Sequence, residues 1–409
     1  MTATRTASAG KQGPSVRSDC FIQIESIGGT EVTITLKTKV ESMYGASLRT
    51  ALSGLAAHFG LQGVAITCED AGALPFVLAA RFEAAVKRAF PENTKEYLPE
   101  MLNAPRPETS RDRLRRSRLY LPGNEPKFFV NAGLHNPDGV ILDLEDSVAP
   151  AEKDAAALLV RNALRSVNFY GCERMVRINQ LPKGLDDLQY IVPNEIDVIL
   201  VPKCESAQQI HDIEKEINRL RKKHKTSRPV YLMPIIESAL GVLKAYDIAA
   251  ASPLNCALAV GLEDYTADIG AERTLEGRES FFARSMVINA AKAAGIQAID
   301  TVFSDVADME GLRQSVLEAK SLGFEGKGCI HPRQIEVIHQ AFAPSQKEID
   351  KALAIRKAFD EATAKGLGVV SLGSKMIDPP VVKRAMNTLR LAELNGLLPA
   401  EHTESEVQP

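Results

Sequence analysis

Val230-Tyr-Leu-Met-Pro-Ile-Ile-Glu237 and Ala257-Leu-Ala-Val-Gly-Leu-Glu-Asp264 are two short apolar runs that each end on an acidic residue. Neither run alternates apolar with polar residues, which is typical of strands buried on both faces of a parallel sheet under helices. In a barrel of alternating strands and helices, the carboxyl ends of the strands meet at one rim, where such barrels carry out their chemistry. The two runs therefore predict that Glu237 and Asp264 form a pair of carboxylates at one rim, as a metal site requires.

The same strand–helix unit recurs along the chain on both sides of these runs. Helical patterns separate the strands, as in residues 207–223, where Ile210, Ile213 and Ile217 fall on one face. Repetition over about 215 residues predicts an α/β fold of the (β/α)8 TIM barrel type. A doubly wound open sheet is the alternative, but its Gly-rich first turn is missing from 121–126. The expected strands are 117–121, 139–144, 174–178, 198–201, 230–236, 257–262, 297–302 and 327–330.

The N-terminal part of the chain has a different pattern. Residues 21–25 and 32–36 alternate apolar with polar side chains, as half-buried strands do, and a third strand is expected at 64–67. Helical patterns cover 44–59 and 76–90, so the order is β-β-α-β-α, which indicates a small α/β binding or carrier module. The chain is therefore expected to divide into a carrier-like domain at 15–91, a linker at 92–115, the barrel at 116–343 and a C-terminal helical arm at 344–400.

Composition narrows the classes of function. The formal net charge of the 409 residues is −3 and Trp is absent, which argues against a nucleic-acid partner. Six scattered cysteines without a CxxC motif suggest free thiols in a reducing compartment, and no apolar run reaches the roughly 20 residues of a membrane helix. We expect a cytoplasmic protein without a membrane partner. Residues 1–17 are basic and lack acids, so a disordered N-terminus and a transit peptide both stay open.

Charged residues follow nearly every expected strand. Such a ring is either a salt-bridged structural belt or a functional site, and its completeness favours a site. The ligands in prospect are mostly oxygens, which suit Mg²⁺ or Mn²⁺ better than zinc. Arg177 could stabilise a developing enolate, although an ion pair with Asp143 or Glu145 would be a purely structural role. The strand-end residues in question are Asp143, Glu145, Arg177, Lys203, Glu237, Asp264, Asp300 and His331.

Five arginines crowd residues 111–118, which lead into the first barrel strand. They are Arg111, Arg113, Arg115, Arg116 and Arg118. One interpretation is a solvated linker. The other is a basic lip, with Arg118 as a substrate-binding residue, that contacts the phosphates of a nucleotide-bearing ligand, because arginine pairs with phosphate through two hydrogen bonds.

At these positions the sequence resembles the beta subunit of citrate lyase, in the wider aldolase and citrate lyase family of barrels. The resemblance implies that Glu237 and Asp264 hold Mg²⁺ and that Arg177 and Glu237 contact the substrate. It also implies that Asp378 reaches the site of a neighbouring subunit, in a trimer or hexamer. The motifs are Arg116-Ser-Arg-Leu-Tyr-Leu-Pro-Gly123, Leu142-Asp-Leu-Glu-Asp-Ser-Val148, Val176-Arg-Ile-Asn179, Ile236-Glu-Ser238, Gly261-Leu-Glu-Asp-Tyr265 and Gly326-Lys-Gly-Cys-Ile-His-Pro-Arg-Gln-Ile335.

Residues 15–90 resemble the gamma subunit of the same enzyme, which is a small acyl carrier. The resemblance rests on Lys39-Val-Glu-Ser-Met-Tyr-Gly45, Glu69-Asp-Ala-Gly-Ala-Leu74 and Ala80-Arg-Phe-Glu-Ala84. In such carriers a serine two residues before an aspartate bears a phosphopantetheine arm derived from coenzyme A. Here that position, before Asp19, is Arg17, and the serine is Ser18. Either Ser18 takes the arm or the carrier role has lapsed; the fusion itself favours modification, because a tethered carrier raises the local concentration of its cargo.

Together these features predict a Mg²⁺-dependent carbon–carbon lyase. Retro-aldol (retro-Claisen) cleavage of a citryl-carrier or citryl-CoA thioester would give oxaloacetate and an acetyl thioester. Asp378 is the candidate for the general base that removes the hydroxyl proton. One alternative is a lyase that acts on free acyl-CoA, such as citramalyl-CoA or malyl-CoA. Another is a non-catalytic assembly subunit. A citrate lyase alpha (acyltransferase) subunit is a candidate partner.

Overall fold

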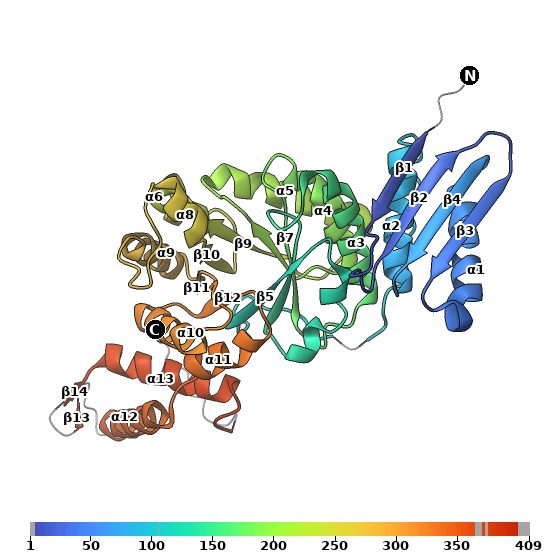
Figure 1. Cartoon of the computed structure of the whole chain (residues 1–409). Helices are drawn as coiled ribbons and strands as arrows, with labels where there is room; N and C mark the ends of the chain where they lie inside the picture. Colours follow the sequence, from blue (N-terminus) through green and yellow to red (C-terminus); the bar gives the residue numbers. More distant parts are fainter. Residues whose placement is uncertain (1–4, 105, 365–369, 373–374, 400–409) are drawn as a thin grey trace.

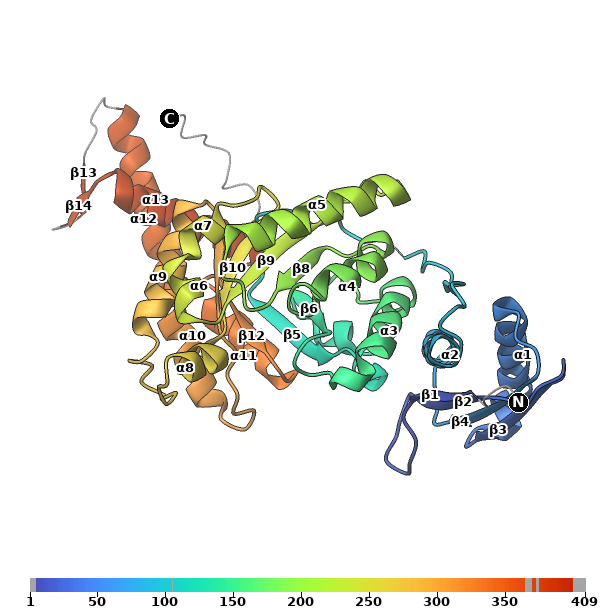
Figure 2. The same ribbon diagram turned by 90° about the horizontal axis from the view of Figure 1, so that it is seen from above.

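The computed structural model describes residues 5–104, 106–364, 370–372 and 375–399. A small sheet domain, a central barrel and a helical arm lie in a row, with the sheet domain (blue) and the arm (red) on opposite sides of the barrel (Figures 1 and 2). This order follows the predicted order of domains along the chain. Among the residues described, no helix combines the length and the apolar character that crossing a membrane requires.

The barrel is closed by eight strands, and every neighbouring pair is parallel. Strand β12 pairs with β5 through Lys327 and Ser117, so the alternative of an open sheet is wrong. All eight expected strands are present, with ends shifted by up to two residues. They are β5 Ser117–Pro122, β6 Gly139–Asp143, β7 Glu173–Arg177, β8 Val198–Val201, β9 Tyr231–Ile236, β10 Ala257–Val260, β11 Gln297–Asp300 and β12 Gly326–Cys329.

Helices surround the barrel and cover the outward side chains of its strands. Helix α5 begins at a capping box, in which Ser206 and Gln209 satisfy each other's backbone amides. The helices are α3 Lys153–Ser166, α4 Gly184–Ile191, α5 Ala207–His224, α6 Ala239–Leu243, α7 Ala245–Ala249, α8 Leu262–Asp268, α9 Phe281–Ala293, α10 Met309–Leu322 and α11 Arg333–Phe342. Short 3-10 turns are η1 Pro126–Phe128, η2 Ala132–His135, η3 Pro150–Glu152 and η4 Val192–Asn194.

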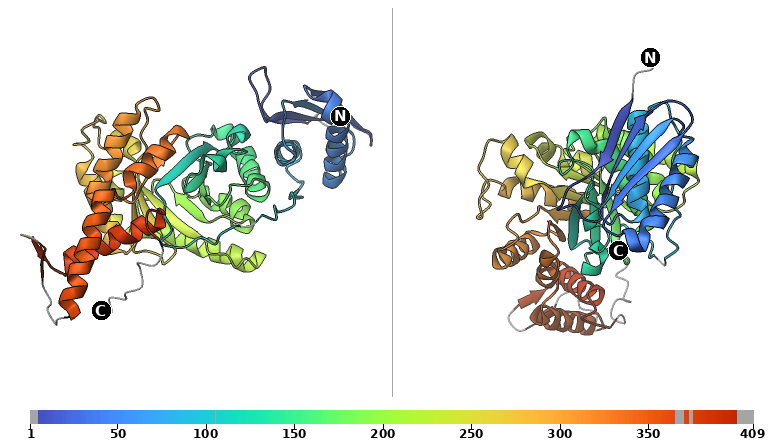
Figure 3. Two further views of the ribbon diagram at one scale, coloured as in Figure 1. Left: turned by 90° about the horizontal axis from the view of Figure 1, so that it is seen from below. Right: turned by 45° about the vertical axis from the view of Figure 1, so that its right-hand side comes forward.

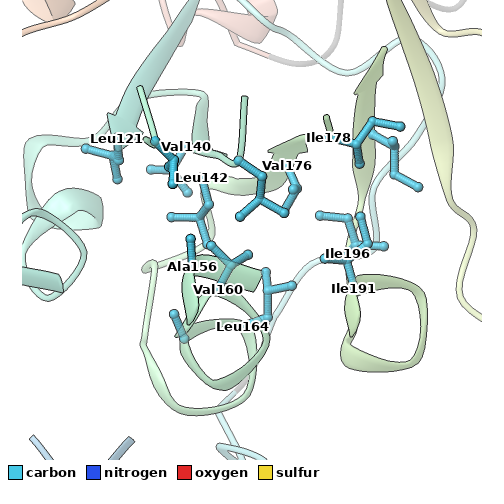
Figure 4. Packing of buried hydrophobic residues seen from close by; sticks show 14 of the residues in the cluster. Leu121, Val140, Leu142, Ala156, Val160, Leu164, Val176, Ile178, Ile191 and Ile196 are labelled. Carbon is cyan, nitrogen blue, oxygen red and sulfur yellow. The ribbon is translucent and has the colours of Figure 1, made fainter. Parts of the chain in front are cut away.

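Two apolar clusters, one outside the barrel and one inside it, fix the register of the barrel strands. Outside the barrel, Leu142 and Val176 pack toward Val160 and Leu164 of α3 (Figure 4). Inside it, side chains of alternate residues fill the lumen, among them Ile141, Met175, Leu200, Met233 and Ile299. Each fully buried side chain of this size contributes about 1.5–3 kcal/mol, and a shift of register by one residue would exchange the two sets. The register is thereby set, and it brings the strand-end residues to one rim.

The N-terminal domain has one strand more than predicted. Strand β1 pairs antiparallel with β2, Ala9 is buried, and the sheet order is β1-β2-β4-β3. The boundary at residue 15 was therefore wrong, and so was a disordered segment for residues 6–10. The run Thr-Ala-Ser-Ala-Gly lacks large apolar residues, yet small residues fit under α2. The elements are β1 Thr6–Gly10, β2 Cys20–Ser26, β3 Val32–Thr38, α1 Glu41–Phe59, β4 Val64–Asp70 and α2 Pro75–Ala89.

The small domain is docked on the barrel through buried contacts. Helix α2 lies between the domain's own sheet and α3 of the barrel (Figure 2). Across this interface Arg161 donates to Glu83 at 2.6 Å, and Asn162 donates its side-chain amide to the carbonyl of Phe76 at 3.1 Å. Both side chains of the ion pair are nearly fully buried. The domain is thus fixed on the barrel by buried contacts and is not attached through the linker alone.

The arginine-rich segment lies at the amino ends of the strands, away from the mouth. Arg115 is fully buried and donates to Glu173 at 2.7 Å. Arg116 pairs with Asp138 at 2.8 Å, and Arg113 donates to the carbonyl of Gly171. The predicted basic lip is wrong, because residues that precede the first strand are carried to the bottom of the barrel, where charge networks serve stability. Arg118 is separate from this group: its side chain points into the lumen.

The C-terminal arm consists of helix α12 Gln346–Ala364, strands β13 Val370–Leu372 and β14 Lys375–Ile377, and helix α13 Pro379–Leu394. Its two helices bury a small apolar cluster of their own, which includes Ile349, Ile355, Val382 and Leu389. The arm (red) lies on the side of the barrel away from the sheet domain (Figure 3). The predicted helical arm is therefore present. Residues 365–369 and 400–409 fall outside the described residues.

Candidate active site

A cavity of about 400 Å³ opens at the carboxyl ends of the barrel strands. Strand β5 contributes its floor through Arg118 and Tyr120, and the loops after the other strands contribute its walls. The charged residues that line it are Arg118, Asp143, Asp146, Arg177, Glu237, Glu263, Asp264 and Asp300. A rim with this concentration of charge is the site where a (β/α)8 barrel places its chemistry.

Glu237 and Asp264 both line this cavity. Glu237 follows β9 directly, is only 6% exposed, and accepts the backbone N–H of Lys203 at 2.8 Å. Burial, together with the smaller effects of the charges on Asp264 and Glu145, raises the pKa of Glu237 to about 7 against the lowering effects of the Lys203 backbone N–H and Arg177. A Cβ on Gly261 would lie 2.5 Å from Oε1 of Glu237, so the glycine provides space for this carboxylate.

Lys203 extends an ammonium group into the middle of the acidic side chains. Its Nζ lies 3.0 Å from Glu145, 3.4 Å from Asp146 and 3.5 Å from Asp264. Burial lowers the pKa of Lys203, but the hydrogen bond to Glu145 and the surrounding carboxylates outweigh it and raise the pKa above its ordinary value. The group of carboxylates therefore has a strong affinity for a cation at this point.

Arg177 is held rigidly at the end of β7. It donates two hydrogen bonds to Asp143, at 2.6 and 2.8 Å, and its NH1 lies 3.0 Å from Glu145. The guanidinium also lies over the ring of Tyr120, 5.4 Å from its centroid. Arg177 therefore forms the structural ion pair considered above and also lines the cavity, with its acidic partners fixing its orientation.

Asp143 organises the loop that carries these partners. Its carboxylate accepts the backbone N–H groups of Glu145 at 3.0 Å and Ser147 at 3.2 Å. Burial raises the pKa of Asp143, but the hydrogen bonds from Arg177 and Ser147 outweigh burial, so the pKa lies below its usual value. The acidic run after β6 is therefore wrapped around a carboxylate whose ionised form is stabilised, and Glu145 lies within 3.0 Å of Lys203.

Asp378 and Ser18, the two remaining predicted site residues, do not line the cavity of their own chain. Asp378 caps helix α13 of the arm by accepting the backbone N–H of Val381. Ser18 precedes β2 in the N-terminal domain and has a φ of 55°. His331, the imidazole among the predicted strand-end residues, accepts the backbone N–H of Arg333 outside the cavity.

The donor set fits Mg²⁺ in part. Among the residues described, no group of three or more His, Cys, Asp or Glu side chains is gathered so as to hold a metal ion. Mg²⁺ is usually held by only one or two carboxylates, and water and substrate supply the remaining ligands. Glu237 and Asp264 match that pattern, and the ammonium of Lys203 beside Asp264 shows that the position attracts a cation.

Two features of the cavity were missed in the sequence. Lys203 lies two residues after β8 and contacts the cavity residues Asp146 and Asp264, a role that its strand-end position alone does not predict. Tyr120 was not singled out at all. Alternation along the strand could have identified Tyr120. Leu119 and Leu121 pack outward, so Arg118 and Tyr120, which alternate with them, point into the lumen.

Comparison with known families gives matches along most of the chain. Residues 116–332 match the family described as HpcH/HpaI aldolase/citrate lyase. Residues 279–397 match one described as carbon–carbon bond lyase of the TIM-barrel fold. Residues 5–89 match an acyl carrier family described as malonate decarboxylase delta subunit, and this match includes strand β1.

Individual relatives have names consistent with these families. The chain is 42% identical over 295 residues to citrate lyase subunit beta of Leuconostoc mesenteroides subsp. cremoris, which covers 71% of this chain and 97% of the relative. It is 34% identical over 291 residues to mitochondrial citramalyl-CoA lyase of Homo sapiens, over 68% of this chain and 85% of that one. A crystal structure of protein CitE from Mycobacterium tuberculosis, in complex with magnesium, acetoacetate and coenzyme A, has a TM-score of 0.57 and 30% identity, over 69% of this chain and 100% of that chain.

Proposed function

Because the chain belongs to the HpcH/HpaI aldolase/citrate lyase family, we propose that it cleaves a 3-hydroxy-acyl thioester, with citryl thioester as the substrate and oxaloacetate and an acetyl thioester as the products. The chain is a carbon–carbon lyase, as its relatives are. The observation that carries the proposal is the cavity in which Glu237, Asp264 and Arg177 converge at one barrel mouth. A scaffold protein has no need for these three charges in one cavity, which weighs against a non-catalytic assembly subunit.

The reaction breaks the bond between the carbinol carbon and the carbon next to the thioester. A base removes the hydroxyl proton, the C–O pair becomes the carbonyl of the oxo acid, and the electrons of the broken bond form a thioester enolate. Protonation of this enolate gives the acyl thioester. Arg177 supports the proposal because its guanidinium is locked by Asp143 and so needs no reorganisation to face developing charge. One such donor contributes about 3–4 kcal/mol to the transition state.

Glu237 and Asp264 are proposed to hold Mg²⁺, which when bound supplies Lewis-acid polarisation of the hydroxy-acid oxygens. The solved relative from Mycobacterium tuberculosis contains magnesium and acetoacetate, which supports this choice of ion. Lys203 keeps Glu145 and Asp146 charge-balanced and donates its backbone N–H to Glu237. In this way it holds one oxygen of Glu237 in place.

The thioester is proposed to be carried on Ser18 through a phosphopantetheine-type arm. The acyl carrier match of residues 5–89 supports this, and so does the backbone of Ser18, whose left-handed conformation costs a non-glycine residue about 1–2 kcal/mol. The second candidate is free acyl-CoA. It is favoured by the citramalyl-CoA lyase relative and by the coenzyme A in the solved structure.

The assembly is proposed to be a trimer or hexamer in which Asp378 of the arm reaches the cavity of a neighbouring subunit and serves as the base. The arm supports this because its helices form their own apolar cluster on the outer side of the barrel. A citrate lyase alpha subunit is the proposed further partner. The six cysteines are all free, as expected in the reducing environment of the cytoplasm.

A panel of citryl, citramalyl and malyl thioesters, assayed with and without Mg²⁺, tests the proposed function. We expect metal-dependent cleavage of at least one thioester. Glu237→Gln should lower kcat/KM roughly a thousandfold, because the lost metal contact is worth several kcal/mol. Asp247→Asn, on the exposed side of α7, is the control that should keep full activity. A fully active Glu237→Gln enzyme would refute the assignment, and absence of both cleavage and oxo-acid binding would favour the assembly subunit.

A further inference from the structure

Arg118 differs from the other fully buried arginines of the described chain because it has no carboxylate partner. Arg81, Arg115 and Arg161 pair with Asp19, Glu173 and Glu83, respectively. Arg118 is 1% exposed, and its guanidinium donates hydrogen bonds only to the thioether of Met233 at 3.2 Å and the backbone carbonyl of Asp300 at 3.4 Å among the described residues. Its Nε has no hydrogen-bond partner. An unpaired buried charge costs several kcal/mol, so folding alone gives no reason for this arginine.

Neither of the residues that pair with Arg118 in the barrel sheet has a side chain that could shield it from the cavity. In the strand register its neighbours are Gly139 of β6 and Gly328 of β12, which have no side chains to cover it. A Cβ on Gly139 would lie 2.6 Å from Cε of Met175, and one on Gly328 would lie 2.7 Å from Val302. Larger residues therefore do not fit at either position, and the guanidinium forms part of the cavity floor.

Three thioesters compete as substrates, and they differ in one substituent on the carbinol carbon. Citryl thioester carries a carboxymethyl group there, citramalyl thioester a methyl group and malyl thioester a hydrogen. The hydroxyl, the neighbouring carboxylate and the thioester are common to all three. Residues that contact the common groups cannot discriminate among the three. A buried cation without a partner discriminates, because only one of the three substituents bears a negative charge.

We propose that Arg118 binds the distal carboxylate of the substrate and so selects citryl thioester over citramalyl and malyl thioesters. This inference rests on the proposed function and specifies its substrate. Arginine matches a carboxylate through two parallel hydrogen bonds, and the unsatisfied Nε together with a terminal nitrogen supplies such a pair of donors. A substrate without that carboxylate leaves the guanidinium unpaired, and buried polar groups left without partners are how sites reject analogues.

The test is the ratio of kcat/KM for citryl over citramalyl thioester, measured on the full chain with Mg²⁺. The wild type should prefer citryl thioester. Arg118→Met replaces the cation with an unbranched apolar side chain and should lower the ratio about a hundredfold, as expected for losing a charged hydrogen-bonded contact. Arg118→Lys should restore part of the ratio. Arg116→Met, at the bottom of the barrel, is the matched control that should leave the ratio unchanged.

Binding of the products gives a second readout that does not depend on turnover. By calorimetry with Mg²⁺, oxaloacetate should bind the wild type more tightly than pyruvate, and Arg118→Met should weaken oxaloacetate alone. An equal affinity of the wild type for the two acids would overturn the proposal even if no variant folds. Cleavage of all three thioesters without preference would overturn the role of Arg118 and leave the lyase intact. Absence of cleavage together with selective oxaloacetate binding would overturn the lyase and leave the carboxylate site.

Discussion

At the scale of single residues, the raised pKa of Glu237 has a direct consequence for the binding of a cation. The side chain is buried, close to Asp264 and Glu145, and titrates near pH 7. A proton and a metal ion compete for the same oxygens, since a carboxylate must be deprotonated to bind a metal. Protonation of Glu237 in the neutral range is therefore expected to control the affinity for Mg²⁺.

We predict that the affinity for Mg²⁺ rises about tenfold per pH unit up to about pH 7 and then levels off. Below pH 7 the neutral form of Glu237 dominates and must lose its proton on binding. Calorimetric titration with Mg²⁺ across this range measures the effect, and Asp247→Asn should reproduce the wild-type profile. A flat profile between about pH 5.5 and 8 would contradict it.

The same shift has the opposite sign for stability without metal. The native state keeps a proton on Glu237 up to about pH 7, whereas the unfolded chain releases it near the ordinary Glu pKa. The native state thus binds more protons in this interval, and its stability falls as pH rises. We predict that Glu237→Gln, which cannot ionise, raises Tm in EDTA at pH 8 more than at pH 5. An equal gain in Tm at pH 5 and pH 8 would show that ionisation of Glu237 does not destabilise the metal-free protein.

A third residue-scale prediction concerns Gly261. Its φ is ordinary, so the requirement for glycine is the close approach of Glu237 and not the backbone conformation. Gly261→Ala should displace the carboxylate and weaken Mg²⁺ binding by about tenfold, the lower end of what altered support of a metal ligand costs. Gly270→Ala is a poor control because its φ is positive, so Gly54→Ala, in open space on α1, serves instead. Unchanged affinity in Gly261→Ala would show that Glu237 binds metal in another rotamer.

The position of Glu237 and Asp264 at one rim was predictable from sequence, because strand ends of a parallel barrel share one rim. Glu237 directly follows β9, whereas Asp264 lies four residues beyond β10, in the first turn of α8. The unpaired state of Arg118 was not predictable. Whether a lumen arginine has a partner depends on what β9, β11 and β12 place opposite it, and here they supply a thioether, a backbone carbonyl and a glycine. Such complementarity across distant strands leaves no local pattern in the sequence.

At the scale of elements, strands such as β8, β9 and β10 were predictable because burial on both faces makes them continuous apolar runs. Strand β1 lacked this signal. Its residues are small, and Gly10 is needed because a Cβ there would lie 1.9 Å from the carbonyl oxygen of Cys20. A strand made of small residues has the same composition as a disordered segment, so composition alone does not distinguish the two.

The interface between α2 and α3 is expected to contribute strongly to stability. Glu83 is fully buried, and it is the partner of the buried Arg161. We predict that Glu83→Gln destabilises the protein by about 3–5 kcal/mol, because it leaves the buried Arg161 with only the more distant and more exposed carboxylate of Glu96, at 3.8 Å. Denaturant unfolding measures this, and Glu92→Gln, which removes an exposed ion pair with Arg5, should cost less than about 1 kcal/mol. Equal losses in the two variants would show that the interface pair adds nothing.

At the scale of the whole molecule, the docked N-terminal domain changes how a carrier would work. A flexible tether raises the local concentration of its cargo only if the arm can span to the site. Here Arg81 binds both Asp19 of the Ser18 loop and the carbonyl of Asn124, two residues beyond β5, and Lys11 pairs with Glu125. The Ser18 loop is therefore fixed beside the barrel segment that follows Pro122, a residue of the cavity wall.

Intact mass of the protein, purified from cells that make the proposed prosthetic group, decides whether this loop delivers substrate. We predict an adduct of phosphopantetheine type on the wild type and on Ser15→Ala, and none on Ser18→Ala. Ser18→Ala should lose turnover of carrier-bound citryl groups while the barrel still cleaves free citryl-CoA, because Ser18 lies outside the cavity. Full activity of an unmodified wild type would instead mean that the docked domain is a structural remnant and that free acyl-CoA is the substrate. The experiment distinguishes a carrier-bound substrate from free acyl-CoA because the charged residues of the barrel are the same for both, and only the attachment of the thioester differs.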